Sequence, residues 1–239
     1  YISAAQMKRV NEDLEGHFSG IGVSFYVLRD TIVVTSIVPG GPSEAAGIMP
    51  WDRIVTVDDS LVAGRKIQNE EVLRTLRGEL GSEVTLGIKR NTAPGLIGIT
   101  VTRGDIPMNS VNAAYMLTET VGFIKLGRNF GFNTFSEFIS AISKLKSRGA
   151  TGFVIDLRGN VGGSLEVVVA MLNEFLNKGD LIVYTEGRNF PRTDNYANGS
   201  GTCKDDDVVV LIDELSASAS EIFAGAIQDH DRGLVIGRR

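Results

Sequence analysis

The sequence has a single cysteine, Cys203, and only two histidines, His17 and His230. One thiol cannot form a disulfide within the chain, and these three residues cannot build a Cys/His zinc cluster. The three consecutive carboxylates at 205–207 are typical of a solvated loop and not of convergent metal ligands. We therefore expect no internal disulfide and no metal site.

Long apolar runs and clusters of basic residues are also missing. No run approaches the length needed to cross a bilayer, and the start, "YISAAQMKRVNEDLEG", contains no apolar region of the signal-peptide kind. A net charge of -5 argues against a nucleic-acid surface, which needs concentrated Lys and Arg. The 43% of apolar residues suits a packed core. We expect a globular chain of one large or two ordinary domains, without stable membrane insertion or nucleic-acid binding.

The first half of the sequence predicts a small β-rich domain after a lead-in helix. The helix, within residues 1–18, carries Met7, Val10 and Leu14 at spacings of three and four. Short β-branched segments separated by Gly, Pro, Asn or Asp then predict strands. They cover 21–28, 31–38, 52–58, 83–90 and 97–103, with helices at 43–48 and 69–78.

The second half predicts an α/β domain. Strands are expected at 112–117, 121–127, 152–158, 181–185 and 208–213, with helices at 134–148 and 164–176, a polar loop after residue 185, and a helix after residue 218. Near-continuous apolar strands that alternate with helices are typical of a sheet buried on both faces.

The stretch "LIDELSASASEIFAGA", 211–226, places three serines at a strand-to-helix turn, where hydrolases expose a nucleophile. Ser218 and Glu221 also have the spacing of a capping box, which is the structural interpretation of the same residues. A Gly-x-Ser-x-Gly elbow is absent. His17 lies in the lead-in, and His230 lies about 18 Å from Ser218 along one helix, so neither is the general base. A lysine that loses its proton in a dry pocket is the alternative activator.

Two glycine-rich turns are candidate binding sites. "DLRGNVGGSL", 156–165, joins a strand to a helix, and its amides suit an oxyanion; a phosphate loop would require Gly-Lys-Ser/Thr. "GIGV", 20–23, precedes a strand and suits a carboxylate beside a strand edge. In both cases a structural glycine turn remains the alternative interpretation.

The segment from about Ser19 to Arg103, with "SIVPGGPSEAAGIMPWDRIVTVDD" and "VTLGIKR", resembles the PDZ domain of proteases. The resemblance implies that an extended peptide binds along the loop and strand 20–28, beside the second helix. The implied peptide-binding residues are Gly20, Ile21, Gly22, Val23, Ser24, Phe25, Val72 and Leu76.

This segment, together with "DLRGNVGGSL" and "SASASEIFAGAIQDHDRG", makes the whole chain similar to the carboxyl-terminal processing, or tail-specific, serine proteases. The resemblance implies a PDZ domain at 19–105 and a crotonase-like or Clp-protease-like α/β catalytic domain at 106–239, without a metal or organic cofactor. It assigns Ser218 as the nucleophile, supported by Ser216 and Ser220. The implied oxyanion amides are those of Ala219 and of Gly162 or Gly163, with Gly163 favoured, and Asp229 has a supporting role or contacts solvent.

The family lysine that activates the serine lies some two dozen residues beyond it, and Arg239 is 239 − 218 = 21 residues beyond. The resemblance therefore implies that this chain lacks its general base and is inactive alone; Lys125 and Lys204 do not replace it. The implied partner is a protein with a free C-terminal tail, in the periplasm or cell envelope, and assembly as a homo-oligomer is left open. A catalytically silent peptide-binding module is the main alternative, and an acyl-coenzyme A enzyme is a weaker one.

Overall fold

The computed structural model of the chain describes residues 12 and 15–238, which divide into two compact units. One unit is His17–Met108, and the other contains the chain from Asn109 onward. The lead-in helix predicted from Met7, Val10 and Leu14 depends on residues outside the described part.

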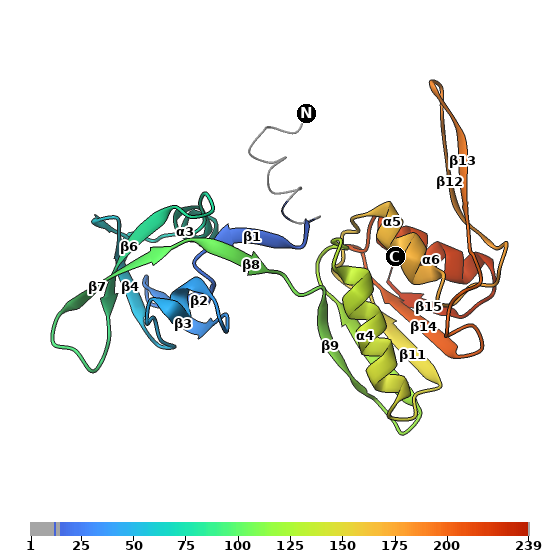
Figure 1. The fold of residues 1–239 in the computed structure, drawn as a ribbon, viewed down its shortest axis with the longest axis horizontal. Coiled ribbons are helices and arrows are strands. Elements are labelled where there is room, and N and C mark those ends of the chain that lie inside the picture. The colour runs from blue at the N-terminus through green and yellow to red at the C-terminus, as the bar shows by residue number, and fades with distance from the viewer. Residues whose placement is uncertain (1–11, 13–14, 239) are drawn as a thin grey trace. The chain divides into compact units, whose positions relative to one another are not determined.

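The first unit is built on an antiparallel sheet in the order β2, β3, β4, β6, β7, with β5 paired to β4 (Figure 1). A separate antiparallel ribbon joins β1 to β8. The five predicted strands and both predicted helices are confirmed. The bounds are β1 His17–Gly20, β2 Val23–Val27, β3 Ile32–Ile37, α2 Pro42–Ala45, β4 Arg53–Val57, β5 Ser60–Leu61, α3 Asn69–Leu76, β6 Glu83–Lys89, β7 Leu96–Thr102 and β8 Gly104–Pro107.

The second unit is an α/β layer structure whose sheet has the order β15, β14, β11, β10, β9. Strands β10, β11, β14 and β15 are parallel, and β9 is antiparallel to β10. The bounds are β9 Val111–Met116, β10 Val121–Leu126, α4 Thr134–Lys146, β11 Gly152–Asp156, α5 Leu165–Leu172, β14 Asp207–Ile212, α6 Ala219–Asp229 and β15 Leu234–Gly237. The predicted alternation of strands and helices is confirmed, and β15 is an additional strand.

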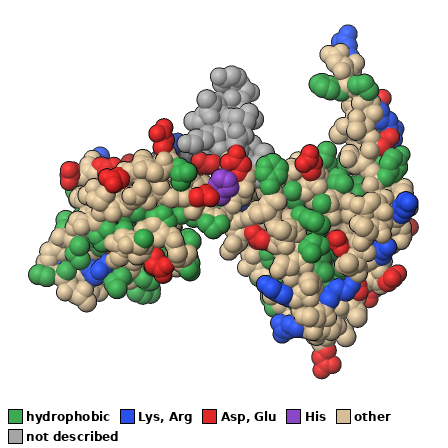
Figure 2. Space-filling model, in the orientation of Figure 1, with side chains coloured by type: hydrophobic (Ala, Val, Ile, Leu, Met, Phe, Trp, Pro, Cys, Tyr) green, Lys and Arg blue, Asp and Glu red, His purple; other side chains and the backbone are tan. Residues whose placement is uncertain are grey.

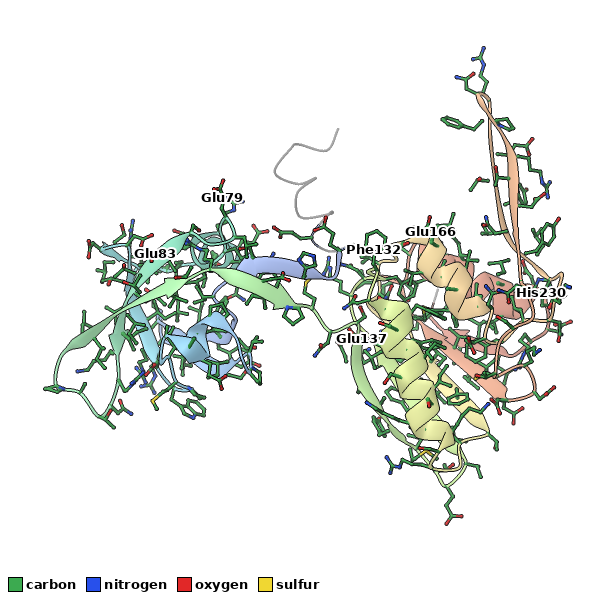
Figure 3. The ribbon with its side chains drawn as sticks, in the orientation of Figure 1. Glu79, Glu83, Phe132, Glu137, Glu166 and His230 are labelled. Carbon is green, nitrogen blue, oxygen red and sulfur yellow. The ribbon has the colours of Figure 1, made fainter. Side chains whose placement is uncertain are left out.

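Helices α4, α5 and α6 cover one face of this sheet (Figure 1). Their apolar stripes meet in a core where Phe175 stands between Phe138 and Phe223, with ring centroids 6.2 and 6.1 Å apart. Glu137 ties α4 to the start of β9 (Figure 3), because its Oε2 accepts from the amides of Ser110 at 2.8 Å and Val111 at 3.0 Å. The helical layer is therefore fixed both by packing and by hydrogen bonds.

The opposite face of the sheet is not covered by any helix of the described residues. Side chains that point to the helices, such as Ile124, Ile155 and Val210, are fully buried. Their neighbours along the strands, Phe123 and Val154, remain partly exposed. The expectation of a sheet buried on both faces is thus met on one face only within the described residues.

The strand predicted at 181–185 is confirmed as β12, Leu181–Gly187. The segment after it, expected to be a polar loop, instead contains β13, Phe190–Tyr196, which pairs with β12 in a hairpin that extends away from the rest of its unit (Figure 1). Hydrophobic side chains lie near its end (Figure 2), where Phe190 is 77% exposed. Both faces of β13 are open to solvent, so the strand lacks the alternation of apolar and polar residues on which strand prediction depends. Pro191 is tolerated because β13 has one free edge.

Candidate active site

The three serines between β14 and α6 lie in three different environments. Ser216 is half-buried, and its Oγ donates to Leu157 O at 2.8 Å and accepts from the Asp213 amide at 3.0 Å. Ser220 is fully buried, and its Oγ donates to Asn160 Oδ1 at 2.6 Å. Ser218 alone of the three is exposed. The two flanking serines hold the turn in place, and Ser218 is the one that a substrate can reach.

The backbone of Ser218 is strained. Its φ of 55° and ψ of -117° lie outside the regions that a non-glycine residue ordinarily adopts, which costs about 1–3 kcal/mol. The predicted capping box is present, with Glu221 Oε2 accepting from the Ser218 amide at 2.6 Å. The Glu221 amide also donates to the main-chain O of Ser218 at 2.9 Å. Capping and exposure of the hydroxyl therefore occur in the same turn.

The glycine pair of the 157–164 loop packs against this turn. Gly162 and Gly163 have φ of 93° and 147°, in the region that favours glycine. A Cβ on Gly162 would lie 2.6 Å from Ala217 O and 2.8 Å from Ser218 Cβ, and one on Gly163 would collide with Phe130 O. A larger residue at position 162 would push the loop away from Ser218, and one at position 163 would push it away from Phe130, so this packing requires glycine at both positions.

Two backbone amides at this contact have no hydrogen-bond partner among the described residues: those of Gly163 and Ala219. The Gly162 amide, in contrast, donates to Asn160 Oδ1 at 2.9 Å. Gly163 itself is held in place because Gly162 O accepts from the Phe130 amide at 2.7 Å and the Ser164 amide donates to Phe130 O at 3.0 Å. Ala219 is the first residue of α6, where helix amides lack internal partners. The geometry thus offers two free N–H groups beside the exposed serine.

Asn160 joins the glycine loop to the serine turn, and the sequence reasoning missed it. Its side chain is fully buried; Nδ2 donates to Gly127 O at 2.6 Å, and Oδ1 accepts from Gly162 and Ser220. Its main-chain O accepts from the Ala217 amide at 3.1 Å. The available signal was an asparagine two residues before a glycine pair, a position where its side chain can bond the backbone two residues on.

Two carboxylates at the strand ends support the loop. Burial raises the pKa of Asp156, but hydrogen bonds from Arg158 and Lys125 outweigh burial and hold that pKa at about 2. The pKa of Asp213 is also lowered, chiefly because its carboxylate accepts from the Gly159 amide at 2.9 Å. Both groups are therefore charged at neutral pH and anchor the loop.

No lysine or histidine in residues 15–238 is hydrogen-bonded to Ser218. Lys125 Nζ pairs with Asp156 at 3.1 Å, and Lys204 Nζ donates to Gly199 O at 2.8 Å. His17 pairs with Asp105 on β8, and His230 lies at the base of the β12–β13 hairpin, with Nε2 2.8 Å from Leu181 O (Figure 3). These contacts occupy the lysine and histidine side chains that sequence reasoning considered as general bases.

The structure does not bring Asp229 to Ser218. It is the last residue of α6, is exposed, and lies eleven residues beyond Ser218, which is about 16 Å at the helical rise. Its position corresponds to the solvent-contact alternative.

The predicted peptide-binding residues lie in the first unit and fall into two groups. Residues 20–25 run from the end of β1 into β2, which is an edge strand whose outer side no described strand pairs with. Val72 and Leu76 of α3 are instead buried in the core beside Ile21, with exposures of 0% and 4%. A free backbone edge is therefore present, and the two α3 residues support it from within the core.

The described residues contain no group of His, Cys, Asp and Glu side chains that could hold a metal ion. Among the same residues, no helix has the length and apolar character needed to cross a membrane.

Comparison with protein families gives two matches. The PDZ domain family matches residues 19–101, and peptidase family S41 matches residues 120–239. The fold and these matches define a class: a peptidase domain accompanied by a PDZ domain. The chain belongs to peptidase family S41, the C-terminal processing type of serine protease.

Individual relatives agree with this assignment. The chain is 36% identical over 240 residues to a protein of Staphylococcus haemolyticus (strain JCSC1435) named probable CtpA-like serine protease, and 35% identical to the protein of that name in Staphylococcus aureus (strain N315). Each alignment covers 100% of this chain and 47% of the relative, so the chain spans about half the length of these curated relatives. The solved photosystem II D1 C-terminal processing protease is 28% identical, with a TM-score of 0.53, over 100% of this chain and 65% of that one.

Proposed function

We propose that this chain carries the nucleophile, the oxyanion site and the substrate-binding PDZ domain of a serine endopeptidase that cleaves proteins near their C-terminus. The observation that supports this most directly is Ser218, an exposed serine in a strained turn beside two free amides. Backbone strain of this kind clusters at catalytic residues, where it fixes a side chain toward the substrate.

In the proposed reaction, Ser218 Oγ attacks a substrate carbonyl carbon while its proton passes to a general base. The resulting oxyanion accepts hydrogen bonds from the amides of Ala219 and Gly163, each of which is worth about 10²–10³ in rate in other enzymes. The amine of the C-terminal fragment leaves with a proton, and water then hydrolyses the acyl-enzyme. The Gly162 amide already bonds Asn160, which favours Gly163 as the second donor.

The general base is proposed to be a lysine in the polypeptide that follows this segment in the longer family members. No lysine or histidine of residues 15–238 bonds Ser218, which supports a base from elsewhere and predicts that the 239-residue chain alone is inactive. No metal or cofactor is required by this mechanism. Location in the periplasm or cell envelope is part of the proposal and rests on the family resemblance.

Substrate capture is proposed to occur by strand addition to β2, with the carboxylate of the tail received by the loop 20–23. The PDZ family match and the free edge of β2 support this role. Near Ser218, Val161 and Leu215 are 38% and 60% exposed, which favours apolar residues at the cleavage site.

The test compares this chain, a version extended to the full reading frame, and the extended version with Ser218→Ala, on a protein that ends in an apolar unstructured tail. We expect cleavage by the extended protein alone. The matched control is Ser143→Ala, which removes an exposed hydroxyl on α4 and should retain turnover. Full activity of Ser218→Ala would refute the residue assignment.

A parallel binding measurement separates the second candidate function, a silent peptide-binding module. A fluorescent tail peptide should bind all of these proteins, and its C-terminal amide should bind at least tenfold more weakly. Binding without cleavage by the extended protein would favour the silent module, and loss of both would refute the role of the PDZ domain.

A further inference from the structure

The face of the second-unit sheet that lies opposite α4, α5 and α6 carries an apolar row across all five strands. Strand pairing aligns one residue of each strand in a continuous row: Tyr115, Phe123, Val154, Val209 and Leu234. The next row on the same face runs Ala113, Lys125, Asp156, Leu211 and Ile236. The uncovered surface is defined by these two rows, and we call it the open face.

Exposure confirms that nothing in the described residues packs on the open face. Tyr115 at one edge is 46% exposed, and Leu234 and Ile236 at the other edge are 65% and 54% exposed. The central apolar members, Phe123, Val154, Val209 and Leu211, are only partly buried and belong to neither core cluster. Tyr115 and Phe123 pack on each other, with ring centroids 5.0 Å apart, and no helix in the described part of the chain covers them.

An apolar sheet face of this width does not normally contact water. Parallel sheets occur almost always with both faces covered, and contiguous exposed apolar patches mark an interaction surface. The charged residues on the face do not contradict this, because Lys125 and Arg158 are both paired with the buried carboxylate of Asp156. We therefore expect another layer of polypeptide to pack on the open face.

We propose that the open face is covered by polypeptide of the same protein that follows β15, as an intramolecular second layer. Two observations favour this occupant over a second copy of the chain. Curated relatives are about twice as long, and 100% of this chain matches only 65% of a solved relative, so family members contain further polypeptide, part of which the proposal places after β15. In addition, β15 forms the sheet edge and carries Leu234 and Ile236, so polypeptide that continues from β15 starts at this face. The proposal does not depend on the role of Ser218.

Thiol labelling can test the proposal, because the native Cys203 is not expected to react with the label. It is fully buried, and burial raises its pKa to about 11. Leu234→Cys and Tyr115→Cys place a thiol at each edge of the open face, and Leu96→Cys, 54% exposed on β7, is the matched control in the other unit. Labelling rates with a maleimide are measured in the 239-residue chain and in the full-length protein.

We expect both open-face thiols to react rapidly in the 239-residue chain and at least 100-fold more slowly in the full-length protein, with Leu96→Cys equally reactive in both. Rapid labelling in the full-length protein would show that the face stays open and would overturn the proposal. Protection already present in the 239-residue chain would also overturn it. In the full-length protein, protection that increases with protein concentration would overturn the proposal, because it would assign the face to a second copy. Protection that does not depend on concentration would support coverage by the same molecule.

Discussion

Replacement of Asn160 by alanine should destabilise the second unit strongly. The change removes three side-chain hydrogen bonds, those with Gly127 O, the Gly162 amide and Ser220 Oγ. Ser220 keeps a bond to the main-chain O of residue 160 at 3.0 Å, so two buried backbone groups are left without partners. Each such group costs about 1–3 kcal/mol, which gives a loss of about 2–6 kcal/mol, a large part of a typical domain stability of about 5–15 kcal/mol.

Urea denaturation can measure this loss for each unit separately. The only tryptophan, Trp51, lies in the first unit, and its fluorescence reports that unit, whereas far-UV circular dichroism is dominated by α4, α5 and α6 of the second. With an m-value of about 2 kcal/mol per molar urea, Asn160→Ala should lower the dichroism midpoint by about 1–3 M. The fluorescence midpoint should stay unchanged.

Asn177→Ala is the matched control, because Asn177 is an exposed asparagine of the same unit. It should move neither midpoint. If Asn160→Ala lowers the dichroism midpoint by less than about 0.5 M, the buried network does not hold the glycine loop against the serine turn, and the reasoning is wrong.

Three other predictions follow from the same unit. Ser218→Gly should stabilise it by about 1 kcal/mol in urea denaturation, because glycine adopts the positive φ without strain; destabilisation would contradict the strain argument. The pKa of Asp156 is lowered from 3.8 to about 2, so its ionised form contributes about 2 kcal/mol to the free energy of unfolding above pH 4. This contribution is lost as the pH falls toward 2. Asp156→Asn should abolish that part of the pH dependence of stability, and an unchanged profile would refute the assignment. Cys203, whose pKa burial raises to about 11, should not react with a disulfide reagent at pH 8 until the chain unfolds, and rapid native labelling would exclude its burial.

The sequence predicted the elements whose pattern is set by burial on one side. Amphipathic α4 and the apolar strand β11 were recognised because their side chains face a core. Strand β13 was missed because both of its faces are exposed to solvent. Strand β15 was missed because it is only four residues long, which is too short to show a periodic pattern. A sequence pattern therefore predicts a helix or strand only when buried and exposed residues alternate regularly along it.

The candidate site divides in the same way. A capping-box spacing is local, so the Ser218–Glu221 cap could be read from the sequence, but the choice of Ser218 over its neighbours came from family resemblance. Asn160 was missed because its partner Ser220 lies 60 residues away. The open face could not be foreseen, because apolar strands indicate that both faces are covered without indicating by what.

The long sequence separation of the contacts that shape the serine turn also bears on when the site forms. Ser216 bonds Leu157 and Ser220 bonds Asn160 across 59 and 60 residues, with α5 and the β12–β13 hairpin in between. Contacts that close such long loops form late in folding, because loop-closure entropy opposes them until much of the sheet is in place. We therefore expect a newly synthesised chain to carry an unstructured serine until the unit is nearly complete, so that a protease of this design cannot cut its neighbours while it is still folding.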